Sequence, residues 1–161
     1  MLDRLPSGVS VFIDSNIFLY HFLDLAPSCS EFFSRVKQRD LRAYTSTIVL
    51  SEVLHQTMLG EIGERYPVMP GGALRFLRRH PEIIPSLTKA PEVIRQISKW
   101  RIRILPLRWR DTKAATELSQ HYRLLTTDAL ILATMRAARL THLASNDADF
   151  ARIPDISLWR P

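Results

Sequence analysis

The chain has 161 residues, a usual size for one domain, and its 46% hydrophobic and 24% charged residues exclude a wholly disordered chain. Its 22 Lys and Arg outnumber its 16 Asp and Glu, and the net charge of +6 favours a polyanionic partner, although many basic proteins bind nothing anionic. The single cysteine, Cys29, excludes an intramolecular disulfide and a zinc site built from cysteines.

Membrane insertion and secretion are not expected from the hydrophobic pattern. No segment reaches the roughly 18 uncharged apolar residues that span a bilayer. Asp14 interrupts the best apolar run near the N-terminus, which therefore lacks the long apolar region of a secretory signal. We expect a cytoplasmic protein that forms one domain over residues 1–161.

The first predicted element is a strand over residues 9–13. It combines β-branched residues with Phe12 and is apolar almost throughout, which is typical of strands buried on both faces in parallel sheets. Helices are then predicted at 17–25 and 30–39, a strand at 41–45, and a helix from residue 48 that should end near Gly60 or Gly63.

The second half of the chain continues the alternation of helices and strands. Residues 66–91 are rich in proline and predict an insertion of loops and short helical pieces. Beyond it we expect a helix opening at Pro91, a strand over 100–105, helices over 111–121 and 129–139, and strands over 141–145 and 156–158. This order predicts a three-layer α/β/α fold with a central, mainly parallel sheet, of the Rossmann-like kind.

Asp14 directly follows the first predicted strand. Ligands of open α/β sheets bind beyond the carboxyl ends of the strands, so this position suits a functional acid. The alternative is that Asp14, Ser15 and Asn16 only cap the following helix, a role for which all three residue types are suited.

Four acids are predicted to converge at this edge. Asp14 and Asp147 each follow an apolar strand, whereas Asp128 and Glu52 lie in helices at the margin of the core. Each acid alone has an ordinary explanation as a cap, a turn former or a solvated helix residue. Together, partly dehydrated carboxylates would repel one another, and a divalent cation would compensate that cost.

An oxygen cluster without a set of His or Cys ligands indicates Mg²⁺ or Mn²⁺ rather than zinc. The chemistry that fits is metal-assisted hydrolysis of a phosphodiester, with the basic residues of the chain holding the phosphate backbone.

Four segments resemble the PIN domain, and in particular the VapC-type ribonuclease toxins of prokaryotic toxin–antitoxin pairs. They are Phe12-Ile13-Asp14-Ser15-Asn16, residues 47–54 with Glu52, residues 125–134 with Asp128, and residues 143–150 with Asp147. The family more often carries Thr at the positions of Ser15 and Ser145, and the 66–91 stretch is longer than in the smallest toxins.

The resemblance implies an endoribonuclease that leaves a 5′-phosphate, associates with an antitoxin and forms a homodimer. It also assigns roles by position: the acidic quartet Asp14, Glu52, Asp128 and Asp147 would hold Mg²⁺ or Mn²⁺ and carry catalysis, and Asn16, Ser15, Ser145 and Asp149 would support them.

Seven arginines are candidates for RNA contact, although a solvated surface is an equal alternative: Arg75, Arg78, Arg79, Arg101, Arg103, Arg108 and Arg110. Two other functions stay open. One is a non-catalytic RNA- or protein-binding module on the same fold. The other is a phosphohydrolase similar to haloacid dehalogenases with Asp14 as nucleophile, which would need a second acid where Asn16 stands.

Overall fold

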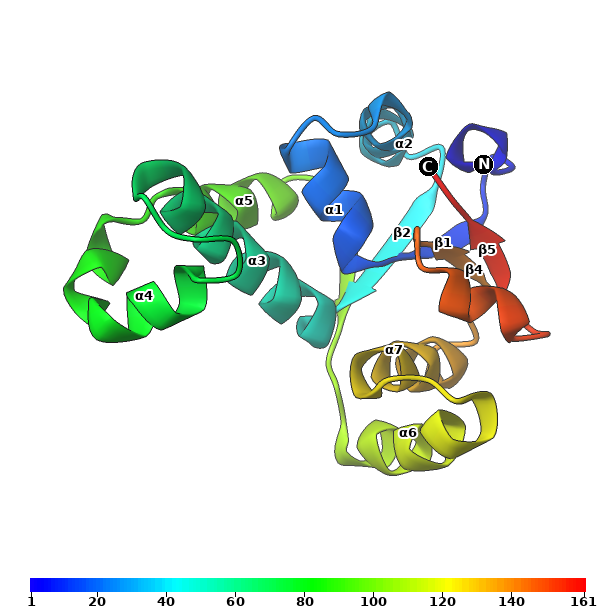
Figure 1. Ribbon diagram of the computed structural model, residues 1–161. Coiled ribbons are helices and arrows are strands. Elements are labelled where there is room, and N and C mark those ends of the chain that lie inside the picture. Colours follow the sequence, from blue (N-terminus) through cyan, green and yellow to red (C-terminus); the bar gives the residue numbers. More distant parts are fainter.

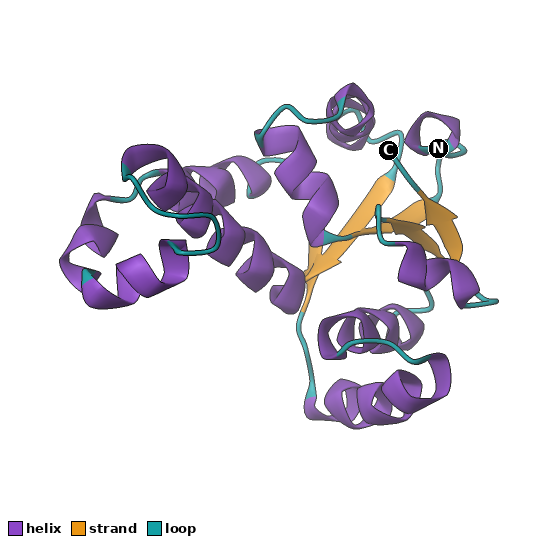
Figure 2. Ribbon diagram, in the orientation of Figure 1, coloured by secondary structure: helices purple, strands orange, loops and turns teal.

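The computed structural model describes all residues from 1 to 161 and is built on a five-stranded parallel sheet with the order β3-β2-β1-β4-β5 (Figure 1, Figure 2). The strands are β1 (Ser10–Ile13), β2 (Arg42–Ser46), β3 (Arg103–Leu105), β4 (His142–Ala144) and β5 (Ser157–Trp159). All four pairings are parallel, so the carboxyl ends of the strands meet at one edge. The predicted three-layer α/β/α fold is confirmed.

β1 occupies the centre of the sheet, where its apolar sequence is needed. Val11, Phe12 and Ile13 are fully buried, although successive side chains point to opposite faces of the sheet. Both faces must therefore be covered by helices. Figure 1 shows α1 (Ser15–Phe22) and α2 (Pro27–Lys37) on one side, and α6 (Trp109–Tyr122) with α7 (Thr126–Ala137) on the other.

The remaining helices form a lobe beside the sheet. α3 (Thr47–Arg65) leads away from the end of β2, and α4 (Ala73–Arg79), the 3₁₀ segment η2 (Pro81–Ser86) and α5 (Lys89–Ile97) pack around its far half (Figure 1). Ile62, Leu77 and Leu87 form a small buried cluster inside this lobe.

α3 ends at Arg65, shortly after Gly63, but neither Gly60 nor Gly63 terminates the helix as expected. The helix continues to Arg65 because Glu61 and Ile62 are buried in the lobe, and this packing outweighs the low helix propensity of glycine. A β-carbon at Gly60 or Gly63 would meet nothing within 4 Å, so neither glycine serves a close approach.

Glu61 joins α3 to the start of α5. Its buried carboxylate accepts hydrogen bonds from the backbone N–H groups of Thr88, at 3.1 Å, and Lys89, at 2.9 Å, and from the Arg65 guanidinium at 3.1 Å. Burial raises the pKa of Glu61, but these hydrogen bonds outweigh burial and lower the pKa below its ordinary value. The carboxylate thus caps α5 from a neighbouring helix.

Several predicted boundaries shift by a few residues. β3 covers only Arg103–Leu105 of the strand expected over 100–105, and α6 begins at Trp109 rather than at residue 111. Two short 3₁₀ segments, η1 (Leu2–Arg4) and η3 (Ala148–Arg152), were not expected. None of the helices combines the length and apolar character needed to cross a bilayer.

Candidate active site

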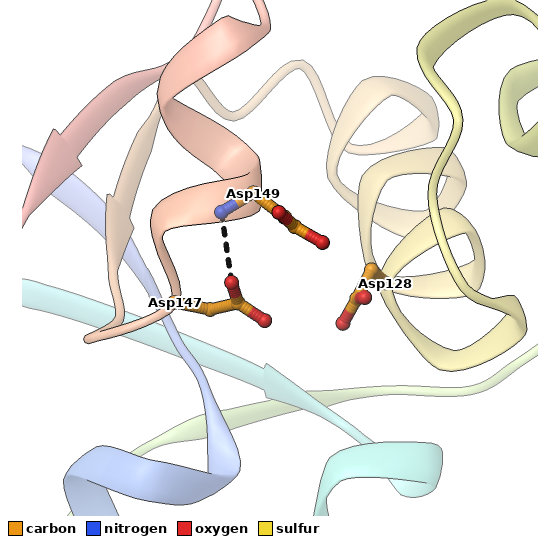
Figure 3. A group of neighbouring side chains, drawn as sticks. All are labelled: Asp128, Asp147 and Asp149. Carbon is orange, nitrogen blue, oxygen red and sulfur yellow. Dashed lines mark hydrogen bonds between the residues drawn. The ribbon is translucent and has the colours of Figure 1, made fainter.

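Three carboxylates converge beside the carboxyl ends of β1 and β4. Asp128 lies in the first turn of α7, and Asp147 and Asp149 lie where β4 gives way to η3. One carboxylate oxygen from each of the three lies within 4.8 Å of the others, and Figure 3 shows Asp128 facing the other two across the gap between their elements. The backbone N–H of Asp149 donates to Asp147 Oδ1 at 2.8 Å, which fixes the relative position of this pair.

Asp14 is held next to this group by a hydrogen-bond network. Asp14 is the N-cap of α1, and its Oδ1 accepts a hydrogen bond from the backbone N–H of Ser15 at 2.7 Å. Its Oδ2 accepts from Asn16 Nδ2 at 2.7 Å and from Ser145 Oγ at 2.6 Å. The capping interpretation of Asp14 is therefore confirmed, and it does not displace a functional one, because the same bonds fix the orientation of the carboxylate.

Ser145 connects the two strand ends. Its hydroxyl donates to Asp14 and accepts from the backbone N–H of Asp147 at 3.0 Å and from Asn16 Nδ2 at 3.2 Å. Ser145 is completely buried, so water does not compete for these bonds. One side chain thus sets the position of Asp14 relative to Asp147.

The acids influence one another electrostatically. Burial raises the pKa of Asp128 to about 6, and the charges of Asp147, Asp14, Asp149 and Glu52 act in the same direction. Burial also raises the pKa of Asp14, against the lowering effect of hydrogen bonds from Ser145 and Ser15. All five acids therefore share one electrostatic site, although Asp14 and Glu52 lie outside the tight group of three.

A divalent cation fits this donor set. The group offers carboxylate oxygens without His or Cys, and such hard ligands suit Mg²⁺ or Mn²⁺. The only ion pair of the three acids joins Asp149 to Arg152 at 2.7 Å, so the charges of Asp128 and Asp147 are left unneutralised by the protein. A cation bound between them would remove the mutual repulsion.

A family model described as PIN domain matches residues 11–156. The chain belongs to the PIN domain family. It is 27% identical over 143 residues to "Ribonuclease VapC2" of Methanocaldococcus jannaschii, covering 89% of this chain and 88% of that protein.

Two solved structures share the fold of this PIN domain. The structure of VapBC2 from Rickettsia felis bound to a DNA fragment from its promoter has a TM-score of 0.61 at 17% identity, and the match covers 94% of this chain and 98% of that one. VapC20 of Mycobacterium tuberculosis, described as a toxin that cleaves the sarcin-ricin loop, has a TM-score of 0.61 at 17% identity, covering 94% and 99%.

The arginines expected to contact RNA fall into two separate places on the PIN domain. Arg75, Arg78 and Arg79 are exposed on α4. That helix packs near Ile62, ten residues beyond Glu52 on α3 and so about 15 Å further along its axis. Arg101, Arg103, Arg108 and Arg110 lie around β3 and the start of α6.

Asn146 and Arg152 were missed by the sequence analysis. The backbone N–H of Asn146 donates to Asn16 Oδ1 at 3.0 Å, and its side-chain amide donates to the Tyr20 hydroxyl at 3.0 Å. Asn146 thereby ties the loop after β4 to α1. Its position between Ser145 and Asp147 was a usable signal, whereas the pairing of Arg152 with Asp149 depends on the 3₁₀ turn of η3 and has none.

Proposed function

We propose that this PIN domain is an endoribonuclease that depends on Mg²⁺ or Mn²⁺ and acts as the toxin of a toxin–antitoxin pair. The observation that carries the proposal is the convergence of Asp128, Asp147 and Asp149 within 4.8 Å, with Asp14 beside them. The similarity to a protein named as a ribonuclease supports RNA as the substrate.

In this mechanism Asp128, Asp147 and Asp149 would hold the cation, and Asp14 and Glu52 would add negative charge from the side of β1 and α3. When bound, a divalent cation lowers the pKa of water in its coordination sphere and stabilises charge on phosphate oxygens. Cation binding would keep Asp128 ionised, although its pKa is about 6 in the cation-free protein. Ser145 and Asn16 would hold Asp14 in one orientation and act as positioning residues.

Removal of the metal tests the proposal directly. Purified protein is expected to cleave single-stranded or structured RNA with Mg²⁺ or Mn²⁺ and to leave a 5′-phosphate. EDTA should abolish cleavage, and an excess of either ion should restore it. Cleavage that persists in EDTA would contradict the proposed chemistry, and calorimetry without any binding of either ion would favour a non-catalytic binding module.

Ser145→Ala is expected to weaken cation binding by about 10- to 100-fold, because the bond that orients Asp14 relative to Asp147 is lost. Calorimetric titration with Mn²⁺ measures this change. Ser145→Thr keeps the hydroxyl and should restore most of the affinity, while Ser98→Ala, on the exposed end of α5, should leave it unchanged. Equal affinity of Ser145→Ala and the wild type would remove Ser145 from the site.

We also propose an apolar groove between α1, α3 and α5 as the docking surface of an antitoxin. The groove encloses about 980 Å³ and is lined by Leu19, Phe22, Leu23, Leu59, Met69 and Val93 among others. Leu23 and Met69 are exposed, at 52% and 79%. The charged lining residues pair with one another, Lys89 with Glu64 and Arg95 with Glu92, and the remaining apolar surface suits an amphipathic segment. Structural neighbours that are toxin–antitoxin complexes support such a partner.

The combined substitution Leu23→Glu and Met69→Glu should abolish co-purification of a co-expressed antitoxin. Charges introduced into the groove would have to be buried by an apolar partner. Ile84→Glu is the matched control, because Ile84 is 44% exposed in the same lobe but outside the groove. Retention of the partner by the double variant would place the antitoxin elsewhere.

From the resemblance alone, we further propose that the chain forms a homodimer, which sedimentation equilibrium tests.

A further inference from the structure

We propose that the edge of β3 binds single-stranded RNA through five arginines and one exposed tryptophan, which present the substrate to the acidic site. We call this surface the β3 strip; it consists of Arg39, Arg42, Arg101, Arg103, Arg108 and Trp109. The inference rests on the proposed ribonuclease function and adds to it the form of the RNA and the surface that holds it.

The five arginines of the β3 strip line two adjoining hollows, and Trp109 follows Arg108 outside them. The first encloses about 300 Å³, and four arginines line it: Arg39, Arg42, Arg101 and Arg103. The second, of about 260 Å³, shares Tyr44 and Arg103 with the first and adds Arg108 at the start of α6. The five arginines thus line two hollows that share Tyr44 and Arg103.

The positive charge of the β3 strip is not neutralised within the protein. None of its five arginines takes part in an ion pair, whereas Arg35, Arg65 and Arg136 elsewhere on the surface each pair with an acid. No acid lines the first hollow. Like charges gathered in this way repel one another, and a polyanion such as a phosphate backbone would offset that repulsion.

One acid, Asp111, lines the second hollow, but it is already engaged. Its side chain is buried, and its Oδ2 accepts from the backbone N–H of Arg108 at 3.0 Å. Its Oδ1 lies 3.7 Å from Arg110 Nε. Asp111 therefore caps α6 and leaves the guanidinium of Arg108 free for another partner.

Trp109 supplies a stacking surface next to these charges. The side chain is 74% exposed and contacts no other aromatic ring, whereas Trp100 is 5% exposed and packs against Phe22 and Phe33. Arg108 and Arg110 flank Trp109 in the chain. An exposed indole beside a basic groove is suited to stack an unpaired base, which a duplex does not offer. This feature favours single-stranded RNA over duplex RNA.

The β3 strip leads toward the acidic site. Tyr44 pairs with Phe12, two residues before Asp14, so it lies about 7 Å below the level of Asp14 along the strands. The second hollow also reaches Thr134, six residues after Asp128 and so about 9 Å along α7. The backbone N–H of Leu107, in the loop before α6, donates to Thr47 at the start of the helix that carries Glu52.

The test measures equilibrium binding of a fluorescein-labelled 15-nucleotide oligouridine in EDTA, where cleavage is prevented, to the full chain. Trp109→Ala should weaken binding by about 5- to 100-fold, the range for loss of one stacked base, and should leave binding of a 15-base-pair RNA duplex unchanged. The combined substitution Arg42→Ala and Arg103→Ala should lower the slope of log K against log salt by about 1.4, as expected for two lost phosphate contacts.

The matched control removes the same charge outside both groups of candidate arginines, with Arg4→Ala and Arg139→Ala, two exposed positions. An equal effect of this pair would show binding through net charge alone and would overturn the proposal. The proposal would also be overturned if the Trp109→Ala variant bound oligouridine like the wild type. A substitution that changed only the sedimentation of the protein would overturn it too, because the surface would then be an interface between copies of the chain. The binding assay needs neither metal nor cleavage. A result that contradicts RNA binding by the β3 strip is therefore distinguishable from a result that contradicts the ribonuclease activity.

Discussion

Asp128→Asn is expected to reduce metal-dependent RNA cleavage by on the order of 10²- to 10³-fold, which corresponds to the several kcal/mol that a bound cation contributes to the transition state. Asp128 faces both Asp147 and Asp149 across the site, so its loss removes the only acid contributed by α7 (Figure 3). Initial rates on a labelled RNA at saturating Mg²⁺ measure the effect. Asp3→Asn makes the same chemical change at an exposed position outside the sheet and should leave the rate unchanged.

Asp128→Asn should also stabilise the metal-free protein at neutral pH. The pKa of Asp128 is about 6 in the fold against 3.8 ordinarily, so the folded chain retains a proton that the unfolded chain loses between these values. The stabilising contribution of the protonated group is thus complete below about pH 4 and is lost as pH rises through 6, by on the order of 1 kcal/mol after solvent screening.

Urea unfolding in EDTA at pH 4.5 and pH 7 separates these effects. Wild-type stability should fall more than that of Asp128→Asn between the two pH values. A variant that lost activity together with stability at pH 7 would indicate that Asp128 supports the fold, and the assignment of Asp128 to the metal site would then be withdrawn.

Glu61→Gln is expected to lower the free energy of unfolding by about 2 to 3 kcal/mol, because a buried carboxylate that accepts several hydrogen bonds is replaced by an amide that can accept fewer. Chemical unfolding at pH 7 measures the total change. Hydrogen exchange should show the loss of protection at the start of α5, where the backbone N–H groups of Thr88 and Lys89 donate to this carboxylate.

The pH dependence of Glu61→Gln provides a second criterion. Because the pKa of Glu61 is lowered in the fold, its contribution is present above its ordinary pKa of 4.5 and is lost as pH falls through the folded value. The difference between wild type and variant should therefore shrink in acid. Glu64 lies on α3 with Glu61 but is exposed and pairs with Lys89 of α5, so Glu64→Gln should change stability by less than about 0.5 kcal/mol. An equal effect of both substitutions would contradict the capping role of Glu61.

The order of elements was predictable because the apolar patterns of β1 and α7 are strong and local. Val11 to Ile13 are fully buried, as the β-branched sequence indicated, and the acids that follow the strands lie at one edge because every strand is parallel. Boundaries that depend on long-range contacts were not predictable. The passage of α3 through Gly60 and Gly63 depends on the burial of Glu61 and Ile62 by segments about 25 residues later in the chain.

The site was predictable in its composition but less so in its geometry. From the sequence we expect a group of Asp14, Glu52, Asp128 and Asp147 with Asp149 in a supporting role, whereas the structure places Asp149 in the tight group with Asp128 and Asp147. The reason is the cap of η3: Asp147 is its N-cap, and the Asp147 side chain accepts a hydrogen bond from the backbone N–H of Asp149, which holds the two acids together. This bond is local, but it has no apolar signature in the sequence. The exposure of Trp109 was also not predictable, because a tryptophan next to two arginines in the sequence is compatible both with an exposed position and with one at the margin of a core.

Two helices extend from the acidic site to the groove beside it. α1 begins next to Asp14 and ends at Leu19, Phe22 and Leu23, which line the groove, and α3 carries Glu52 one turn before the groove residues Gln56 and Thr57. If a displacement at one end of α1 or α3 reached the other end, occupation of the groove and of the acidic site would be thermodynamically linked. Such linkage is reciprocal: if an occupant of the groove changed the cation affinity by some factor, the cation would change the occupant's affinity by the same factor.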